Sequence, residues 1–227
     1  MQSAVIIGAS GGIGGALADA IEEEARFKRV WRLSRRDGLD LTDEASIADA
    51  AARVGAGPPP ALVIVATGIL HDAEHGPEKA LKDLEADWLA RVHAINAIGP
   101  ALVAKHFLPL FPRTGTPTFA ALSARVGSIG DNALGGWHGY RASKAALNML
   151  LRNIAIEARR KYDRTIVVGL HPGTVDTGLS KPFQGNVAPG KLFAPDRAAL
   201  QLLDVLDGLK PHDSGKVFAW DGAEIPF

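Results

Sequence analysis

The chain has 227 residues, and 47% of them are hydrophobic, which is enough apolar material for the core of one large domain. We therefore interpret residues 1–227 as a single domain. Lysine plus arginine and aspartate plus glutamate each number 25, so no net charge draws the chain to nucleic acid or to an anionic membrane. The lack of cysteine excludes disulfides, thiolate catalysis and cysteine-bound metal, and we predict no metal site.

The N-terminal segment lacks a basic leader, and no apolar run approaches the roughly 18 residues of a membrane span. We therefore expect a soluble, cytoplasmic protein. Residues 4–7 form a short apolar run, typical of a strand buried on both faces of a parallel sheet. They lead into a glycine-rich turn and then a helical pattern, which is the order that presents backbone N–H groups to a pyrophosphate. Glycine clusters alone are often mere turns, but this position predicts dinucleotide contacts at Gly8, Ser10, Gly11, Gly12, Ile13 and Gly14.

The second predicted strand, residues 29–33, ends close to Arg35 and Arg36. In a dinucleotide-binding fold this end faces the adenosine ribose, where arginine accommodates a 2′-phosphate and a carboxylate would bind the free hydroxyl. The two arginines therefore predict NADP rather than NAD, although they could also belong to a solvated loop. Too few residues follow for another parallel crossover, so we expect the sheet to be shortened here, with Asp40 and Leu41 close enough to reach the adenine.

The rest of the chain alternates strands with helices, which predicts a doubly wound parallel sheet, or Rossmann fold, of six to seven strands with helices on both faces. Ligands in such sheets bind beyond the carboxyl ends of the strands. A helix over 84–111 should be kinked or interrupted at Gly99-Pro100. The remaining strands are expected at 61–66, 117–122, 165–170 and 216–220, and the remaining helices at 45–54, 140–161 and 195–206.

Tyr140 and Lys144 lie four residues apart on a predicted helix, so their side chains share one face. A free phenol has a pKa of about 10, and a nearby cation lowers that value. A tyrosine tuned in this way can act as a general acid or base. Because the spacing also occurs by chance on surface helices, its interpretation depends on the other motifs.

Four motifs in this order resemble the classical short-chain dehydrogenase/reductases over essentially the whole chain: Gly-x-x-x-Gly-x-Gly at 8–14, Asn96, a serine-bearing strand end before Tyr140-x-x-x-Lys144, and Pro172-Gly173. The segments 127–129, 140–148 and 221–226 are similar to the C-factor-like branch of that family. The resemblance implies an NADP-dependent oxidoreductase that transfers hydride between a nicotinamide and a small carbonyl or secondary alcohol.

The resemblance also implies roles for individual residues. Tyr140 would exchange a proton with the substrate oxygen, Lys144 would lower the pKa of Tyr140 and hold the nicotinamide ribose, and Asn96 would anchor a water in a proton relay. Further cofactor contacts would come from Ala66, Thr67, Gly68, Pro172, Gly173, Val175 and Thr177.

One departure from the family pattern affects catalysis. Ala124 stands where the family has a serine that orients the carbonyl, and we favour Ser128 over Ser123 as its replacement. If neither hydroxyl reaches the oxygen, the alternative is a non-catalytic NAD(P)-binding protein that signals or senses redox state.

The 140–161 helix is apolar nearly all round, which favours a homodimer or homotetramer. Several apolar residues could form a substrate pocket or could simply pack together: Leu134, Trp137, Leu179, Phe183 and Phe193.

Overall fold

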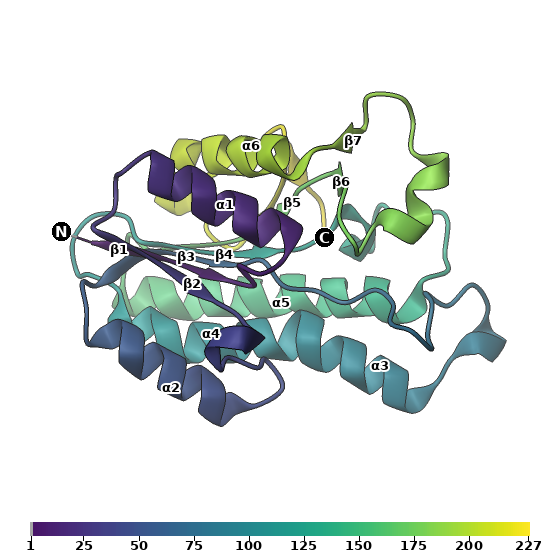
Figure 1. Cartoon of the computed structure of the whole chain (residues 1–227), viewed down its shortest axis with the longest axis horizontal. Helices are drawn as coiled ribbons and strands as arrows, with labels where there is room; N and C mark the ends of the chain where they lie inside the picture. Colours follow the sequence, from purple (N-terminus) through teal and green to yellow (C-terminus); the bar gives the residue numbers. More distant parts are fainter. Residues whose placement is uncertain (1) are drawn as a thin grey trace.

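The computed structural model describes residues 2–227, and it contains the predicted Rossmann-type sheet with helices on both faces (Figure 1). The sheet has seven strands in the order β2-β1-β3-β4-β5-β8-β9, of which only β9 is antiparallel to its neighbour among the described residues. A separate two-stranded sheet pairs β6 (Thr174–Val175) with β7 (Leu192–Phe193). The seven strands are β1 Ser3–Ile7, β2 Arg29–Leu33, β3 Pro60–Val65, β4 Thr118–Leu122, β5 Ile166–His171, β8 Val217–Ala219 and β9 Glu224–Ile225.

Two apolar cores lie on opposite faces of the large sheet. Because successive side chains of a strand point to opposite faces, Val5 and Ile7 of β1 enter one core and Ala4 and Ile6 enter the other. The first core is covered by α2 (Glu44–Gly55), α4 (Gly99–Phe107) and α5 (His138–Lys161), and the second by α1 (Gly12–Glu23) and α6 (Pro195–Gly208). This double burial explains why residues 4–7 of β1 are all apolar.

The expected shortening after the second strand is confirmed. From β2 the chain passes through a single 3₁₀ turn, Arg35–Asp37, and then enters α2, whose first turn is capped by Asp43 accepting the Ala45 N–H at 3.0 Å. The crossover ends at β3 beside β1, which leaves β2 at the edge of the sheet.

The helix predicted over 84–111 is interrupted, as expected, but the irregular turn precedes the glycine and proline. It consists of α3 (Ala86–His93), a π-helical turn (Ala94–Ile98) and then α4. Pro100 has no N–H, so the carbonyl of Asn96 cannot receive the α-helical bond that this N–H would supply. Wide π turns of this kind are frequent at functional sites, and this one contains Asn96.

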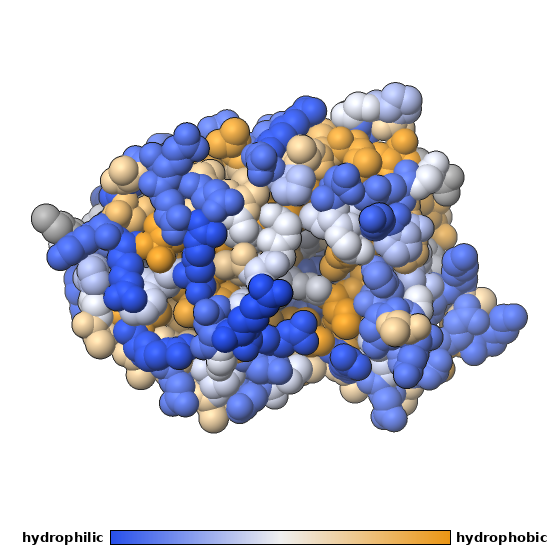
Figure 2. Space-filling model, in the orientation of Figure 1, coloured by the Kyte–Doolittle hydropathy of each residue, from blue (hydrophilic) through white to orange (hydrophobic). Residues whose placement is uncertain are grey.

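The carboxyl ends of the parallel strands meet on the right in Figure 1, where β6 and β7 stand above the start of α5. Figure 2 shows apolar side chains gathered over this β6–β7 region, whereas hydrophilic side chains dominate the rest of the visible face. Within residues 2–227 we find no helix with the length and apolarity that a membrane crossing requires.

The glycine-rich turn predicts opposite outcomes for two neighbouring substitutions. An added Cβ at Gly14 would lie 2.2 Å from the Gly8 carbonyl oxygen, whereas one at Gly15 would make an ordinary contact of 3.4 Å with the Ala9 oxygen. We expect Gly14→Ala to lower the free energy of unfolding by about 1–3 kcal/mol through overpacking. Gly15→Ala, the matched control inside α1, should raise it by up to about 1 kcal/mol. Urea unfolding measures both, and equal effects would contradict the packing argument.

Candidate active site

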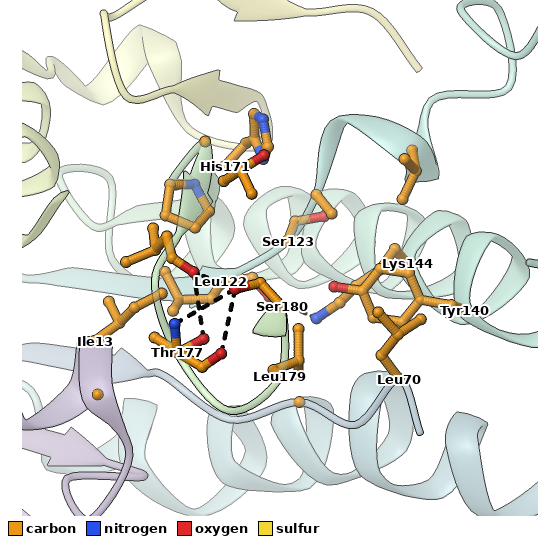
Figure 3. Close-up of a pocket in the computed structure, with 18 of the residues that line it drawn as sticks. Ile13, Leu70, Leu122, Ser123, Tyr140, Lys144, His171, Thr177, Leu179 and Ser180 are labelled. Carbon is orange, nitrogen blue, oxygen red and sulfur yellow. Dashed lines mark hydrogen bonds between the residues drawn. The ribbon is translucent and has the colours of Figure 1, made fainter. Parts of the chain in front are cut away.

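A cavity of about 480 Å³ runs along the carboxyl ends of the strands (Figure 3). It extends from the glycine-rich turn to the start of α5, so it brings together residues from most of the chain. Residues of the glycine turn and the end of β3 line one part: Gly11, Gly12, Ile13, Ala66, Thr67 and Gly68. Predicted residues from β4, α5 and the segment after β5 line the rest: Ser123, Tyr140, Lys144, Pro172, Gly173, Val175 and Thr177.

The glycine-rich turn presents bare backbone to the cavity. Gly11 caps α1 without a side-chain hydrogen bond, so the first N–H groups of that helix remain available to an anion. An added Cβ at Gly12 would lie 2.8 Å from Thr177 Cγ2, so only glycine leaves this passage open. Gly8 has φ +89°, and Gly14 touches its carbonyl, so these two glycines shape the turn from behind the lining.

An unpartnered hydroxyl lies next to this turn. Thr67 Oγ1 is buried and has no hydrogen-bond partner among the described residues, although Thr67 lines the cavity. Its Cγ2 lies 2.8 Å from where a Cβ of Gly8 would stand. A buried hydroxyl without a partner costs free energy unless something bonds to it. This hydroxyl and the glycine turn together fit a dinucleotide, with its phosphates at α1.

Tyr140 and Lys144 lie side by side at the other end of the cavity. The Lys144 Nζ is 5.7 Å from the centroid of the Tyr140 ring, and Figure 3 shows both polar ends directed into the cavity. Lys144 is 2% exposed, and its ammonium donates to the Leu122 carbonyl at 2.8 Å. The lysine is therefore held between α5 and the end of β4.

Burial is the main influence on the pKa values of Tyr140 and Lys144 in this structure, and the expected lowering of the Tyr140 pKa by Lys144 stays a prediction. Burial raises the pKa of Tyr140 to about 12 and lowers that of Lys144 to about 8, because the charged form of each group loses solvation. Tyr140 is thus protonated at neutral pH. It can donate a proton, while Lys144 is still mostly charged beside it.

Asn96 lies just outside the cavity lining, where it is bonded to Ile69. Its Oδ1 accepts the Ile69 N–H at 2.8 Å, and its Nδ2 donates to the Ile69 carbonyl at 2.8 Å and to Ser143 Oγ at 3.1 Å. Its Oδ1 lies 3.5 Å from where a Cβ of Gly68 would stand, and Lys144 Nζ lies 3.6 Å from the same point. Asn96 does not line the cavity itself, but its Oδ1 and the Lys144 Nζ both lie next to Gly68.

The serine alternatives are separated by the structure. Ser123 lines the cavity, but its hydroxyl donates to Asn148 Oδ1 at 2.6 Å. Ser128, which we favoured, lies outside the lining, and its Oγ accepts the Asp131 N–H at 3.2 Å. Ser128 is 1% exposed and follows the 3₁₀ turn η5 (Arg125–Gly127), of which Arg125 and Val126 line the cavity. The cavity lining favours Ser123 over Ser128, and a catalytic role for either serine stays a prediction. Ala124 lines the cavity next to Ser123.

The residues predicted for the adenosine end lie outside the cavity lining. Arg35 and Arg36 are exposed, and within residues 2–227 neither makes a salt bridge, so both guanidinium groups can receive a phosphate. Asp40 instead accepts the Thr42 N–H and hydroxyl through Oδ1, at 2.8 and 2.7 Å. These bonds hold the pKa of Asp40 low and leave Oδ1 committed to the local turn.

Two other residues that were predicted to contact the cofactor, Leu41 and Ser10, also lie outside the cavity lining. Leu41 is buried against Gly99, because a Cβ added to Gly99 would lie 2.7 Å from the Leu41 Cβ. Leu41 therefore packs in the core instead of facing an adenine. Ser10 is exposed on the glycine turn. In residues 2–227 no three histidine or acidic side chains come together as a potential metal site.

One functional residue escaped the sequence analysis. Glu78 is 4% exposed, and its Oε2 accepts the Gly139 N–H at 3.1 Å, so it supplies the cap that Trp137 does not give to α5. Its carbonyl also accepts the Trp137 N–H at 2.5 Å. Glu78 therefore holds the first turn of the helix that carries Tyr140. The contact spans 61 residues, and no local pattern could have indicated it.

The apolar residues that could form a substrate pocket or simply pack together fall into two groups. Trp137, Leu179 and Phe183 line the cavity, with the Trp137 and Phe183 ring centroids 5.2 Å apart. Leu134 is 90% exposed, and buried Phe193 packs edge-on against Trp220 with the ring centroids 4.8 Å apart. The lining also contains residues that had not been predicted, among them Leu70 and His171, and burial lowers the pKa of His171 to about 4.

The chain is similar in sequence and fold to known proteins. The chain is 37% identical over 148 residues to the C-signal of Myxococcus xanthus, covering 65% of this chain and 84% of the relative. It is 33% identical over 186 residues to the 1-hydroxy-2-glutathionyl-2-methyl-3-butene dehydrogenase of Rhodococcus sp. (strain AD45), covering 82% of this chain and 76% of that enzyme.

A solved structure of an NADPH-bound carbonyl reductase from chicken fatty liver superposes with a TM-score of 0.79 at 25% identity, covering 100% of this chain and 94% of that one. Residues 8–200 match the family described as enoyl-(acyl carrier protein) reductase. The glycine turn, the tyrosine–lysine pair and these similarities together show that the chain belongs to the classical short-chain dehydrogenase/reductase family and is an oxidoreductase of that family.

Proposed function

We propose that this oxidoreductase uses NADP(H) to reduce a carbonyl group of a small molecule, with Tyr140 as the proton donor. The observation that carries the proposal is the continuous cavity that joins an open helix N-terminus at Gly11 to the Tyr140 and Lys144 side chains. NADPH, when bound, supplies the hydride. The chain's own residues then hold the substrate and provide the proton.

The proton step follows from the environment of Tyr140. Burial raises the pKa of the phenol to about 12, so the O–H form dominates at neutral pH and is ready to protonate the oxygen of a reacting carbonyl. As the proton leaves, the neighbouring Lys144 ammonium stabilises the negative charge of the phenolate. The ammonium stays in place because it donates to the Leu122 carbonyl. Trp137, Phe183 and Leu179 give this end of the cavity an apolar lining.

NADP is favoured over NAD by charge at the end of β2. Arg35 and Arg36 are exposed there, and Asp40, the nearby acid that sequence analysis considered, has Oδ1 bound to Thr42. The NADPH-bound state of the chicken carbonyl reductase supports the same choice. A cytoplasmic location remains a prediction from the sequence.

The rival function is a dinucleotide-binding protein without turnover, and a specific observation favours it. Ala124 lines the cavity but has no hydroxyl to orient a carbonyl oxygen. This rival predicts that NADPH binds tightly, that no carbonyl is reduced above background, and that Tyr140→Phe behaves like the wild type.

Replacing the proton donor tests the proposal. Tyr140→Phe should lower NADPH-dependent turnover of a panel of aldehydes, ketones and quinones by about 10²–10⁴-fold, because the general acid is lost. Lys144→Met should lower turnover too and also weaken NADPH binding. The chain's other tyrosine, Tyr162, lies at the far end of α5, so Tyr162→Phe is the matched control and should keep full activity. Undiminished turnover in both the Tyr140 and the Lys144 variant would end the proposal.

Cofactor preference has its own test. Calorimetry should give a lower Kd for NADPH than for NADH, and the double change Arg35→Ser with Arg36→Ser should reduce the ratio of the two dissociation constants by about tenfold or more, since charge-assisted bonds to the 2′-phosphate are lost. Arg29→Ser changes the same charge at the opposite end of β2 and should leave the ratio unchanged. Tighter binding of NADH by the wild type would refute the argument from Arg35 and Arg36.

We also propose that the chain forms a homodimer or homotetramer through the outer face of α5. Met149 is 61% exposed and Ile156 is 46% exposed, and their spacing of two turns puts them on one side of the helix. Sedimentation equilibrium at micromolar concentration should give at least twice the chain mass, and Met149→Glu with Ile156→Glu should lower it to a monomer. A monomeric wild type would contradict this prediction.

A further inference from the structure

The part of the cavity formed by β4, η5 and α5 has few hydroxyl groups. Among residues 118–161, the hydroxyl-bearing side chains that line the cavity are Ser123 and Tyr140. The Ser123 hydroxyl donates to Asn148 Oδ1 at 2.6 Å, and Asn148 is 2% exposed, so this bond is shielded from water. A hydroxyl has one proton to donate. Tyr140 is therefore the hydroxyl on this side that remains available to a substrate oxygen.

The neighbouring position holds a methyl group. The backbone at Ala124 is extended, with φ −153° and ψ 146°, so its Cβ points away from the direction taken by Ser123. The following turn rests on α5: an added Cβ at Gly127 would lie 2.7 Å from the Lys144 Cβ. Ala124 lines the same cavity as Tyr140 and Lys144, and in this chain its side chain cannot donate a hydrogen bond.

Two further polar side chains in this part of the cavity, Lys144 and Arg125, are already bonded within the protein. Lys144 donates to the Leu122 carbonyl, and Arg125, which also lines the cavity, is paired with Asp131 at 2.8 Å. Leu70 and Leu179 line the cavity together with Tyr140 (Figure 3). The Trp137 and Tyr140 ring centroids lie 6.4 Å apart, so this end of the cavity is walled by aromatic and aliphatic groups.

We propose that the enzyme's substrates are carbonyl compounds already made electron-poor by an adjacent electron-withdrawing group, such as α-keto esters and α-diketones, carried on an aromatic or apolar body. This inference rests on the proposed function. Negative charge develops on the carbonyl oxygen during reduction, and removing one oxyanion donor typically costs about 10²–10³ in rate. An electron-withdrawing neighbour stabilises that charge within the substrate, so the lack of a second hydroxyl costs such substrates less.

The atoms and electrons of the step balance as follows. The carbonyl carbon gains a hydride from NADPH, which is oxidised to NADP⁺, and the carbonyl π pair moves to the oxygen. The O–H bond of Tyr140 breaks and its proton joins that oxygen, which gives a secondary alcohol when the substrate is a ketone. The Tyr140 phenolate recovers a proton from solvent.

The test compares the wild type with Ala124→Ser on para-substituted acetophenones and on ethyl benzoylformate, with NADPH saturating. In the wild type, kcat/KM should rise steeply with electron withdrawal. Ala124→Ser should raise kcat/KM for acetophenone by about 10²-fold and for ethyl benzoylformate by less than about threefold, so the dependence flattens. Ala133→Ser, which adds the same hydroxyl to an exposed loop residue outside the cavity lining, is the matched control and should leave the series unchanged.

A binding readout complements turnover. Benzamide has a carbonyl that accepts a hydrogen bond but is not reduced, so calorimetry on the NADP⁺ complex reports the donors alone. Ala124→Ser should tighten benzamide binding about tenfold, as one additional bond to a carbonyl allows. Unchanged benzamide affinity, or an equal rise in kcat/KM for every ketone, would overturn the inference while leaving the proposed function standing.

Two other outcomes are also decisive. A loss of about tenfold or more in Ser123→Ala for all substrates, with no gain in Ala124→Ser, would assign the second hydrogen bond to Ser123 and overturn the inference. If neither the wild type nor Ala124→Ser reduces any carbonyl although NADPH binds, the proposed function itself fails, and the inference fails with it.

Discussion

The site depends on the hydrogen bond from the buried Lys144 ammonium to the Leu122 carbonyl. A charged group this deeply enclosed is costly unless it is paired or hydrogen-bonded, and this bond ties α5 to the end of β4 at the place where strand and helix meet the cavity. The close approach of Gly127 to Lys144 tightens the same junction, because any side chain there would meet the lysine. Tyr140 thus takes its position from a lysine that is held by the sheet.

The start of α5 is constrained independently. Glu78 accepts the Gly139 N–H, and an added Cβ at Gly139 would lie 2.7 Å from the Glu78 Oε1, so glycine is required for the carboxylate to reach the helix. Trp137, just before the helix, has φ +51°, a left-handed conformation that costs free energy for a bulky residue. The Glu78 carbonyl holds that residue through its N–H and so keeps the indole at the cavity.

Residue patterns predicted the sheet and most of the site because those features are local. The apolar run of β1, the glycines after it and the four-residue spacing of Tyr140 and Lys144 all act within a few residues. What could not be predicted depends on contacts between distant segments. The Ser123–Asn148 bond joins residues 25 apart and occupies the Ser123 hydroxyl, and the burial that raises the pKa of Tyr140 cannot be read from residue spacing.

The shortened sheet also leaves an edge strand that could pair with a second molecule of this protein. With no strand beyond it, β2 exposes backbone N–H and C=O groups that could pair with another chain. Its side chains hinder such pairing: the Arg32 guanidinium is bonded to Asp19 and Glu22 of α1, and that of Arg29 stacks 3.4 Å from the Trp31 ring centroid. A second chain that approached this five-residue edge strand would therefore meet the charged side chains of Arg29 and Arg32.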